Sequence, residues 1–480
     1  MTDRNRWIAV YVLCTGMLMI VLDVTVVNVA LPYIQSDLGF SATSLAWVVN
    51  AYLIAFGGLL LLAGRLGDLY GPRRVFLAGI TLFSIASVVC GVSTNELELV
   101  LARFVQGAGG ALTSAVILGM IVTLFPQPRE QAQAIGVFAF VASAGGAVGL
   151  LAGGVLTQAI NWHWIFFVNV PIGVATVLLA RRFVPADKAP TGTGSVDSGG
   201  ALLITAALML GVYTIVKPAA EDGWSSPRTL VPAGLSMLLL VGFLRWEAWA
   251  EHPLMPLRIF RSRNLCGANL VQVLGAAGMF GTFFLGALYV QKVLHYSPLT
   301  IGFAFLPVSV LMGTVSVRYS ERLIGRFGAR SLCIGGMALI AVALGWLSQV
   351  STHGGYWTHI FGPLVLIGLG AGLCFPPLMG LAMSGTDAED AGLASGLINT
   401  TGQVGGAVGL AVLATVTATR TEVLTRHGTT LDEALTGGYR VGFWISAGLV
   451  LLGAVVAATG LRTPTVSPDP TQELAAEPIG

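Results

Sequence analysis

The sequence predicts an all-α integral membrane protein with fourteen transmembrane helices, and three observations lead to that fold class. Of the 480 residues, 55% are hydrophobic and only 10% are charged, whereas soluble domains are about a quarter charged. Fourteen apolar runs are long enough to cross roughly 30 Å of hydrocarbon at about 1.5 Å of helix rise per residue. One glycine-rich segment, GGAVGL, occurs twice, at Gly145–Leu150 and at Gly405–Leu410. The chain is therefore expected to contain two related sets of membrane helices.

The first six runs form the first predicted unit, a six-helix bundle over 7–183. No small-residue cleavage site follows the first run, so we expect that run to be retained as a span and not removed as a signal peptide. The six predicted spans are 7–31, 45–64, 74–93, 97–124, 131–156 and 164–183.

The next two runs, 197–217 and 229–248, form a predicted inserted pair over 197–248, and the last six form a second bundle over 265–461. A weaker echo supports this division, because GRLGDLYGPRR from Gly64 aligns with ERLIGRFGARS from Glu321 when Gly71 is set on Gly328. Repeated halves of this kind suit a transporter with its site between them. The last six spans are 265–290, 299–318, 331–350, 359–384, 391–417 and 440–461, and the Pro-rich stretch 463–480 is predicted to be a disordered cytoplasmic tail.

The distribution of basic residues predicts the orientation. If the N-terminus is cytoplasmic, eighteen of the 25 Lys and Arg residues lie inside, six lie outside, and Arg103 is within a span. This bias places both termini in the cytoplasm. A net charge of +2 gives no indication of nucleic-acid binding. The five cysteines all lie in apolar runs without metal-ligand spacing, so we expect them to be packing residues and predict no metal site.

Two charged residues lie deep inside predicted spans, Asp23 and Arg103. A charge in hydrocarbon costs several kcal/mol, so each is a functional candidate by default. Their similar depth allows them to touch. One interpretation is a fixed ion pair between them, and another is a carboxylate that gains and loses a proton during a transport cycle. Arg103 could alternatively donate hydrogen bonds to backbone carbonyls.

Several segments now carry a resemblance to a known family. Gly64-x-Leu66-Gly67-Asp68-x-x-Gly71-x-Arg73-Arg74 resembles the loop motif of the major facilitator superfamily. LDVTVVNVALP (Leu22–Pro32) resembles the first-span signature of its fourteen-helix drug/proton antiporters, and NWHWIFFVNVPIG (Asn161–Gly173) resembles the entry to their sixth span. LVLARFVQGAGGA (Leu99–Ala111) is similar to the fourth-span arginine motif. The sequence departs from the family at Leu69, Pro72, Leu150 and His163.

The resemblance implies roles for two groups of residues. It puts Asp23 and Arg103 in proton coupling. It implies a conformational latch made by Gly64, Arg65, Asp68, Gly71, Arg73 and Arg74, with Asp68 near the end of a helix of the other half. On the fifth span, Gly136, Gly145, Gly149, Gly153 and Gly154 resemble the family's antiporter motif. Gly145, Gly149 and Gly153 recur every four residues and so share one helix face, which is either a static packing seam or a surface that slides or rocks during alternating access.

Polar and aromatic residues inside the spans are candidates for the substrate cavity, although ordinary packing would also account for them. These candidates are Tyr52, Gln106, Asn269, Gln272, Phe280, Phe284, Asn399 and Gln403.

The leading functional hypothesis is a monomeric, proton-coupled antiporter of a bacterial plasma membrane that exports lipophilic drugs or antibiotics, cationic or neutral, by alternating access. It would need no cofactor, since the proton gradient drives it, and its partners would be protons, the small-molecule substrate and the lipid bilayer. A dedicated exporter of one endogenous metabolite or antibiotic is the alternative, and a proton-coupled importer is a more distant one. The absence of a nucleophile–base motif and of a nucleotide-binding loop argues against an enzyme and against direct ATP drive.

Overall fold

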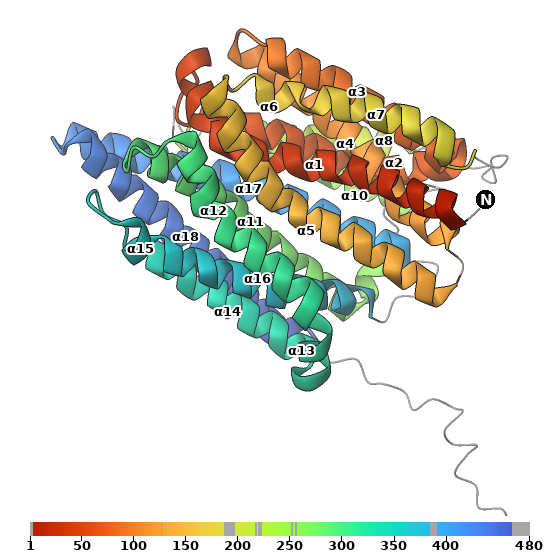
Figure 1. Ribbon diagram of the computed structural model, residues 1–480. Coiled ribbons are helices and arrows are strands. Elements are labelled where there is room, and N and C mark those ends of the chain that lie inside the picture. The colour runs from red at the N-terminus through yellow and green to blue at the C-terminus, as the bar shows by residue number, and fades with distance from the viewer. Residues whose placement is uncertain are drawn as a thin grey trace, which may run out of the picture.

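Long α-helices that run along one common direction make up nearly all of the described secondary structure (Figure 1). The computed structural model describes residues 3–125, 127–186, 197–216, 218, 223–250, 253–254, 257–384 and 391–462. The predicted tail over 463–480 lies outside the described residues. Within them the chain forms no strand, so the predicted all-α fold class is confirmed.

The first half of the chain contains the helices of six spans. They are α1 (Asp3–Leu38), α2 (Trp47–Tyr70) after the short 3-10 turn η1 (Ser44–Ala46), α3 (Pro72–Val92), α4 (Glu96–Leu124), α5 (Pro128–Ala159), and α6 (Trp164–Phe167) with α7 (Asn169–Phe183).

Two further helices follow, and six more spans make up the second half. The pair is α8 (Ser198–Val216) and α10 (Pro227–Trp249), followed by the 3-10 turn η2 (Leu257–Arg261). The second half has α11 (Arg263–Lys292), α12 (Pro298–Thr314) with the π-helical turn η3 (Val315–Tyr319) and α13 (Ser320–Phe327), α14 (Ala329–Leu347), α15 (Tyr356–His359) with α16 (Phe361–Met383), α17 (Ala391–Arg426) and α18 (Leu431–Gly460).

The lengths of these helices agree with a membrane protein. Among the described residues, thirteen segments are long and apolar enough to cross a membrane, and the apolar part of α5, Ala144–Ala159, is a shorter fourteenth. Several helices extend beyond the predicted spans: α1 reaches Leu38, α17 reaches Arg426 and α18 begins at Leu431. Hydropathy detects only the apolar part of a helix, whereas backbone hydrogen bonds continue into its polar ends.

Helix packing separates the chain into two bundles that are built alike. In the first half α1 packs on α5, and α4 packs on α2 and α3. In the second half α11 packs on α17, and α16 packs on α12 and α14. The two halves meet mainly along two seams, α2 with α17 and α5 with α12, and α1 makes smaller contacts with α11 and α12. The helices α8 and α10 pack on each other, and α8 covers α2 and α17. The predicted division into 7–183, 197–248 and 265–461 stays a prediction, which this packing supports.

Corresponding loops show the same backbone conformation in both halves. Gly71 separates α2 from α3 with φ +96°, and Gly328 separates α13 from α14 with φ +79°. A side chain is strained at such positive φ values, so glycine permits both sharp turns. Pro72 then occupies the first position of α3, where its missing N–H costs no helical hydrogen bond.

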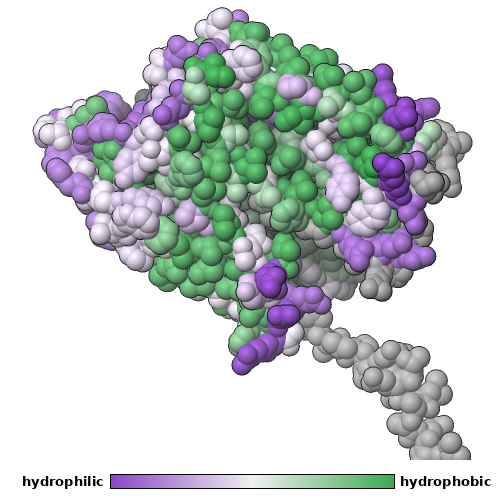
Figure 2. Space-filling view, in the orientation of Figure 1, coloured by the Kyte–Doolittle hydropathy of each residue, from purple (hydrophilic) through white to green (hydrophobic). Residues whose placement is uncertain are grey.

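The outer surface is hydrophobic over much of its middle. Figure 2 shows hydrophobic residues across the centre of the visible face and hydrophilic residues gathered toward its left and right ends. On α10, Val231, Met237 and Leu238 are each at least 60% exposed, as expected for a helix that faces lipid. The start of α1 and the end of α18 lie at one end of the bundle, here called the terminal end (Figure 1). The opposite end, where α1 ends and α2 begins, is called the distal end.

Candidate functional site

The two buried charges of the first half form an ion pair. Asp23 on α1 and Arg103 on α4 are 0% and 1% exposed, and the Asp23 Oδ2 atom lies 2.5 Å from the Arg103 Nη1 atom. Contact between them was possible from their predicted depth, and the structure shows that it is made. A pair with this burial is isolated from both ends of the bundle, so each charge depends on the other for stabilisation.

Two amides complete the hydrogen bonding of the Asp23 carboxylate. The side chains of Gln106 and Asn169 donate to its Oδ1 atom at 2.7 and 3.1 Å. Gln106 also donates to the Ser87 hydroxyl at 2.9 Å and accepts from Arg103 Nη1 at 2.7 Å. The carboxylate thus accepts bonds from α4 and α7, and α3 joins through Ser87. We call Asp23, Arg103, Gln106, Asn169 and Ser87 the polar network.

Arg103 is held on its other sides by α2. Its Nε donates to the Val48 carbonyl at 2.9 Å, and its guanidinium carbon lies 4.5 Å from the centre of the Tyr52 ring. Both sequence-based interpretations of Arg103, pairing with Asp23 and bonding to a backbone carbonyl, are therefore observed together. The backbone bond also gives the guanidinium a partner that does not depend on the charge of Asp23.

Glycines on α4 let the surrounding helices approach closely enough to form the polar network. A Cβ atom on Gly107 would overlap the Tyr52 carbonyl of α2, and one on Gly109 would lie 2.6 Å from the backbone of Phe83 on α3. Side chains at these positions would push α2 and α3 away from α4. The quoted motif Leu99–Ala111 therefore supplies both the polar groups and the small residues that bring partners to them.

Two members of the polar network were not predicted as site residues. Asn169 falls within the segment Asn161–Gly173, quoted for its family resemblance, so its position in that motif was an available signal. Ser87 had no comparable signal, because one serine in an apolar helix usually bonds to its own backbone. Ser87 does so as well, donating to the Phe83 carbonyl at 2.8 Å.

The repeat permits a comparison with the same place in the second half. Gly107 approaches Tyr52, and Gly368 of α16 approaches Val308 of α12 in the same way. Arg103 lies four residues before Gly107, and Leu364 lies four residues before Gly368. Gln106 and Ile367 each lie directly before the glycine of their own half. The counterparts of the charged arginine and its amide neighbour are therefore apolar.

The remaining positions agree with this comparison. Ser87 lies sixteen residues after Gly71, and Leu344 lies sixteen residues after Gly328, so Leu344 is the counterpart of Ser87. Gly149 meets the Leu22 carbonyl on α1, and its repeat partner Gly409 meets Ala277 on α11. Asp23, the residue after Leu22, therefore corresponds to Gly278. The second half has no acid, arginine or amide at any of these positions.

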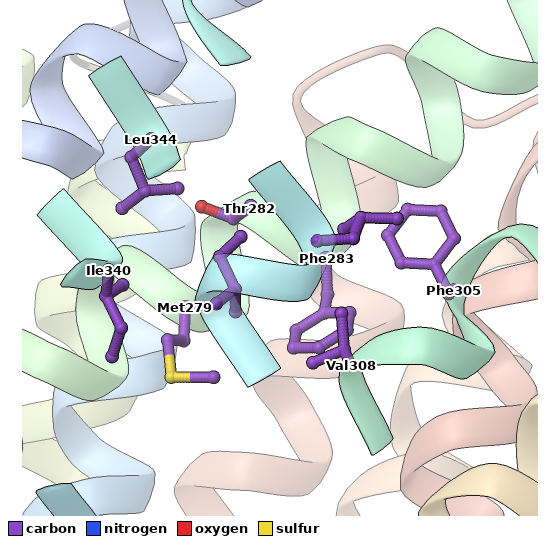
Figure 3. Close-up of a pocket in the computed structure, with 9 residues that line it drawn as sticks. Met279, Thr282, Phe283, Phe305, Val308, Ile340 and Leu344 are labelled. Carbon is purple, nitrogen blue, oxygen red and sulfur yellow. The ribbon is translucent and has the colours of Figure 1, made fainter. Parts of the chain in front are cut away.

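A small apolar cavity occupies the corresponding place in the second half (Figure 3). Its volume is about 10 Å³, far below the 300–1,000 Å³ that is typical of a site for a drug-sized ligand. Its walls come from α11, α12, α14 and α16 and include Met279, Val308, Leu344, Leu364 and Ile367. One bundle thus encloses a charged network where the cavity of its twin is lined by apolar side chains and one threonine, Thr282.

The predicted latch residues lie on the loop between α2 and α3 at the terminal end, and the structure describes them in part. Arg73 donates a hydrogen bond to the Arg181 carbonyl at the end of α7. Arg65 and Arg74 also interact with other groups, and a side chain on Gly64 would meet no neighbour within 4 Å. The side chain of Asp68 lies outside the described residues, so its contact with the other half stays a prediction.

The glycines of α5 divide between two faces. Side chains on Gly145, Gly149 and Gly153 would meet α1, a helix of the same half. A side chain on Gly154 would lie 2.8 Å from the backbone of α12, in the other half. The Gly145–Gly149–Gly153 face thus packs within one bundle, and Gly154 lies on the seam between bundles. The surroundings of Gly136 lie outside the described residues.

Comparison with known proteins identifies the family. The model of the Major Facilitator Superfamily matches residues 13–410. The chain belongs to the Major Facilitator Superfamily. It is 38% identical over 482 residues to the puromycin resistance protein pur8 of Streptomyces alboniger, covering 99% of this chain and 95% of that protein. It is 40% identical over 415 residues to the cephamycin export protein CmcT of Amycolatopsis lactamdurans, covering 86% and 85% of the two chains.

Solved structures agree on the fold. A bacterial homologue of the human lysosomal transporter Spinster, crystallised in an inward-facing and unoccupied conformation, superposes with a TM-score of 0.67 at 15% identity, covering 97% of this chain and 100% of that one. At this identity the likeness concerns the fold alone. The chain is thus a multi-pass membrane transporter of this superfamily. In the described residues, no group of three or more His, Cys, Asp or Glu side chains could hold a metal ion.

The predicted cavity residues of this transporter occupy different environments. Tyr52, Gln106 and Phe284 are at most 1% exposed and lie inside their own bundles, where packing leaves no room for a substrate. Asn269 accepts a hydrogen bond from Thr401 at 2.8 Å, within the second half. Gln272 and Phe280 pack against glycines of α17, and Asn399 has an interaction partner of its own. Gln403 lies on the seam with α2, where its Cβ atom would lie 2.9 Å from a side chain on Gly57.

Proposed function

We propose that this transporter is a proton-coupled antiporter that exports lipophilic antibiotics or drugs, cationic or neutral, by alternating access. It would work as a monomer in a bacterial plasma membrane with both termini in the cytoplasm. The relatives named above are a resistance protein and an export protein, which supports the direction of transport. The bias of basic residues supports the orientation.

The observation that carries the proton-coupling proposal is the one-sided polar network. Two bundles with the same helix packing enclose opposite contents at corresponding positions, charged in one and apolar in the other. Apolar side chains are therefore sufficient to build such a bundle. Because a buried ion pair often contributes less to stability than well-packed apolar residues of similar volume, its presence in one half favours a functional role.

The geometry suggests how Asp23 could take up a proton. In this structure the carboxylate is paired with Arg103. When Asp23 is protonated, Arg103 would lose its counter-ion but keep the Val48 carbonyl and the Gln106 amide oxygen as acceptors, at 2.9 and 2.7 Å. The protonated carboxyl could in turn donate one hydrogen bond. The network thus offers partners to both protonation states, and opening of the first bundle to one end would admit the proton.

The loop between α2 and α3 is proposed to bias the conformational equilibrium. An ionised Asp68 near the N-terminal end of a helix of the other half would favour the state in which the terminal ends are closed. The corresponding position of the second half is Gly325, which has no charge. One latch is therefore expected to dominate, on the loop of the first half.

A dedicated exporter of one compound is the second candidate, because each relative named above is described by a single antibiotic. An importer is disfavoured by the glycine pattern of α5. Substrate breadth separates the first two candidates: a multidrug pump would protect against chemically unrelated compounds, and a dedicated exporter would protect against one.

The test is a resistance and accumulation panel in a pump-deficient bacterial host, with puromycin, chloramphenicol and ethidium as probes. The parent chain should lower the accumulation of at least one probe, and collapse of the proton gradient should abolish the effect. Asp23→Asn should do the same while the protein remains in the membrane. Unchanged export by Asp23→Asn against a gradient would show that Asp23 does not couple the proton.

A further inference from the structure

The two seams between the bundles differ in their polar content. Along α5 and α12 the contact is made by glycines against backbone: a side chain on Gly154 would lie 2.8 Å from Leu299, and one on Gly302 would lie 2.6 Å from the Leu150 carbonyl. No described residue of α12 has a buried side-chain polar atom without a hydrogen-bond partner. On α5 the Thr157 hydroxyl is buried without a hydrogen-bond partner, but Thr157 lies one helical turn from Gly153, on the face toward α1.

The seam of α2 with α17 contains buried polar atoms that bond to nothing in the described part of the chain. The Asn50 side chain is 0% exposed, and neither its amide nitrogen nor its oxygen has a partner. On α17 the Thr400 hydroxyl and the Gln403 Oε1 atom are also buried and also lack a hydrogen-bond partner, although both residues are partly exposed. Buried polar groups are nearly always hydrogen-bonded, so three side chains with unpartnered atoms at one seam between the bundles call for an explanation.

Helix periodicity places these groups on the facing surfaces. Asn50, Gly57 and Leu61 are spaced by seven and four residues, so they share one face of α2. A side chain on Gly57 would lie 2.9 Å from the Gln403 Cβ atom, and one on Gly396 would lie 3.0 Å from Leu61. That face therefore packs on α17, with Gln403 opposite the middle of α2 and Asn50 nearer the distal end. In this structure α2 and α17 are in contact along this face.

The chemistry of the seam indicates what it could bind. Neither 47–64 of α2 nor 391–419 of α17 contains a charged residue. Its polar groups are two amides and a hydroxyl among apolar side chains. They match uncharged hydrogen-bonding groups, such as amides and hydroxyls, on a lipophilic molecule, and leaving them unpaired makes the closed seam costly.

We propose that Asn50, Thr400 and Gln403 form the hydrogen-bonding wall of the transport path, which opens when α2 and α17 separate and binds the uncharged amide or hydroxyl groups of the substrate. This inference rests on the proposed export function and adds the substrate chemistry. The wall belongs to one seam, and the α5–α12 seam, with its close glycine contacts, provides the contact about which the bundles move.

The test compares apolar replacements on the seam with a matched control inside one bundle. Asn50→Leu, Thr400→Val and Gln403→Leu remove the polar atoms and nearly keep the shape. Ser446→Ala is the control, because the Ser446 hydroxyl is 0% exposed and unpartnered too, yet lies where a side chain on Gly278 would meet the backbone of α18, within the second half. Export of puromycin and of chloramphenicol, which both carry an amide and hydroxyls, is measured in inverted membrane vesicles, together with the Tm of each purified variant.

Each seam variant should raise the half-saturating concentration of an exported probe about two- to tenfold, the effect of one lost neutral hydrogen bond. The Tm should be unchanged or higher because an unpaired polar group has been removed, and Ser446→Ala should keep the parent's half-saturating concentration. A half-saturating concentration equal to the parent's in all three seam variants would refute the proposed hydrogen-bonding wall. A lower Tm for all three would overturn it as well, because the polar atoms would then have structural partners. Export of neither probe by the parent chain would overturn the proposed function and this inference with it.

Discussion

A double-mutant cycle on the Asp23–Arg103 pair tests the reasoning about the polar network most directly. The perturbations are Asp23→Leu, Arg103→Leu and the two together. Each single replacement leaves one buried charge without its counter-ion, and breaking a buried ion pair in this way costs about 3–5 kcal/mol. Both side chains are at most 1% exposed, so solvent can screen little of that cost.

The double variant should be less damaged than the sum of the two single variants. It leaves no unpaired charge, and Leu364 shows that an apolar residue fills the place of Arg103 in the other bundle. Its cost comes mainly from Gln106 and Asn169, which each lose a charged partner, at about 1–2 kcal/mol apiece. The singles then sum to about 6–10 kcal/mol against about 2–4 kcal/mol for the double, a coupling of at least 2 kcal/mol.

The assay is thermal unfolding of the purified variants in one detergent, followed by intrinsic fluorescence. For a unit of 150–250 residues, about the size of one bundle, each kcal/mol corresponds to about 2–4 °C, so each single variant should lose about 6–20 °C. The double variant should unfold at a higher temperature than the less stable single. Additive losses would refute the argument, because they would mean that the two charges do not stabilise each other.

The remaining predictions concern transport and topology. Gly149→Leu should impair export more than Leu150→Pro, because its Cβ atom would overlap Thr25 and lie 3.0 Å from the Leu22 carbonyl, whereas proline would only restore a bend common in the family; a fully active Gly149→Leu protein would contradict the close approach of α1 and α5. Reporter fusions at Lys188 and Arg462 should both give a cytoplasmic signal, and a periplasmic signal from either would contradict the orientation. With Asp23 as the one proton site, export of a monovalent cation from proteoliposomes should follow a pH difference, at about 1.36 kcal/mol per pH unit, and ignore an imposed voltage. A neutral substrate should respond to both, since 100 mV adds about 2.3 kcal/mol per charge; voltage-driven accumulation of the cation would require a second proton site.

Much of the architecture followed from the sequence because its causes are local. A run of apolar residues long enough to cross the bilayer can satisfy its backbone there only as a helix or in a closed barrel, so fourteen runs predicted fourteen helices. The repeated GGAVGL segment predicted two related bundles. Asp23 and Arg103 could be singled out because a charge in an apolar run carries a high cost wherever the helix is placed.

The tertiary structure decided how each helix is rotated and which helix it meets. Sequence alone did not bring Asn169 and Ser87 to the Asp23–Arg103 pair, because that depends on the relative depth and rotation of α3 and α7. Nor could it show that Gly149 faces α1 while Gly154 faces α12, that Leu364 takes the place of Arg103, or that Asn50 is unpaired on the α2–α17 seam. A turn of about 100° separates neighbouring residues on a helix, so a small rotation changes which of them is buried, and only the packing of all the helices together selects that rotation.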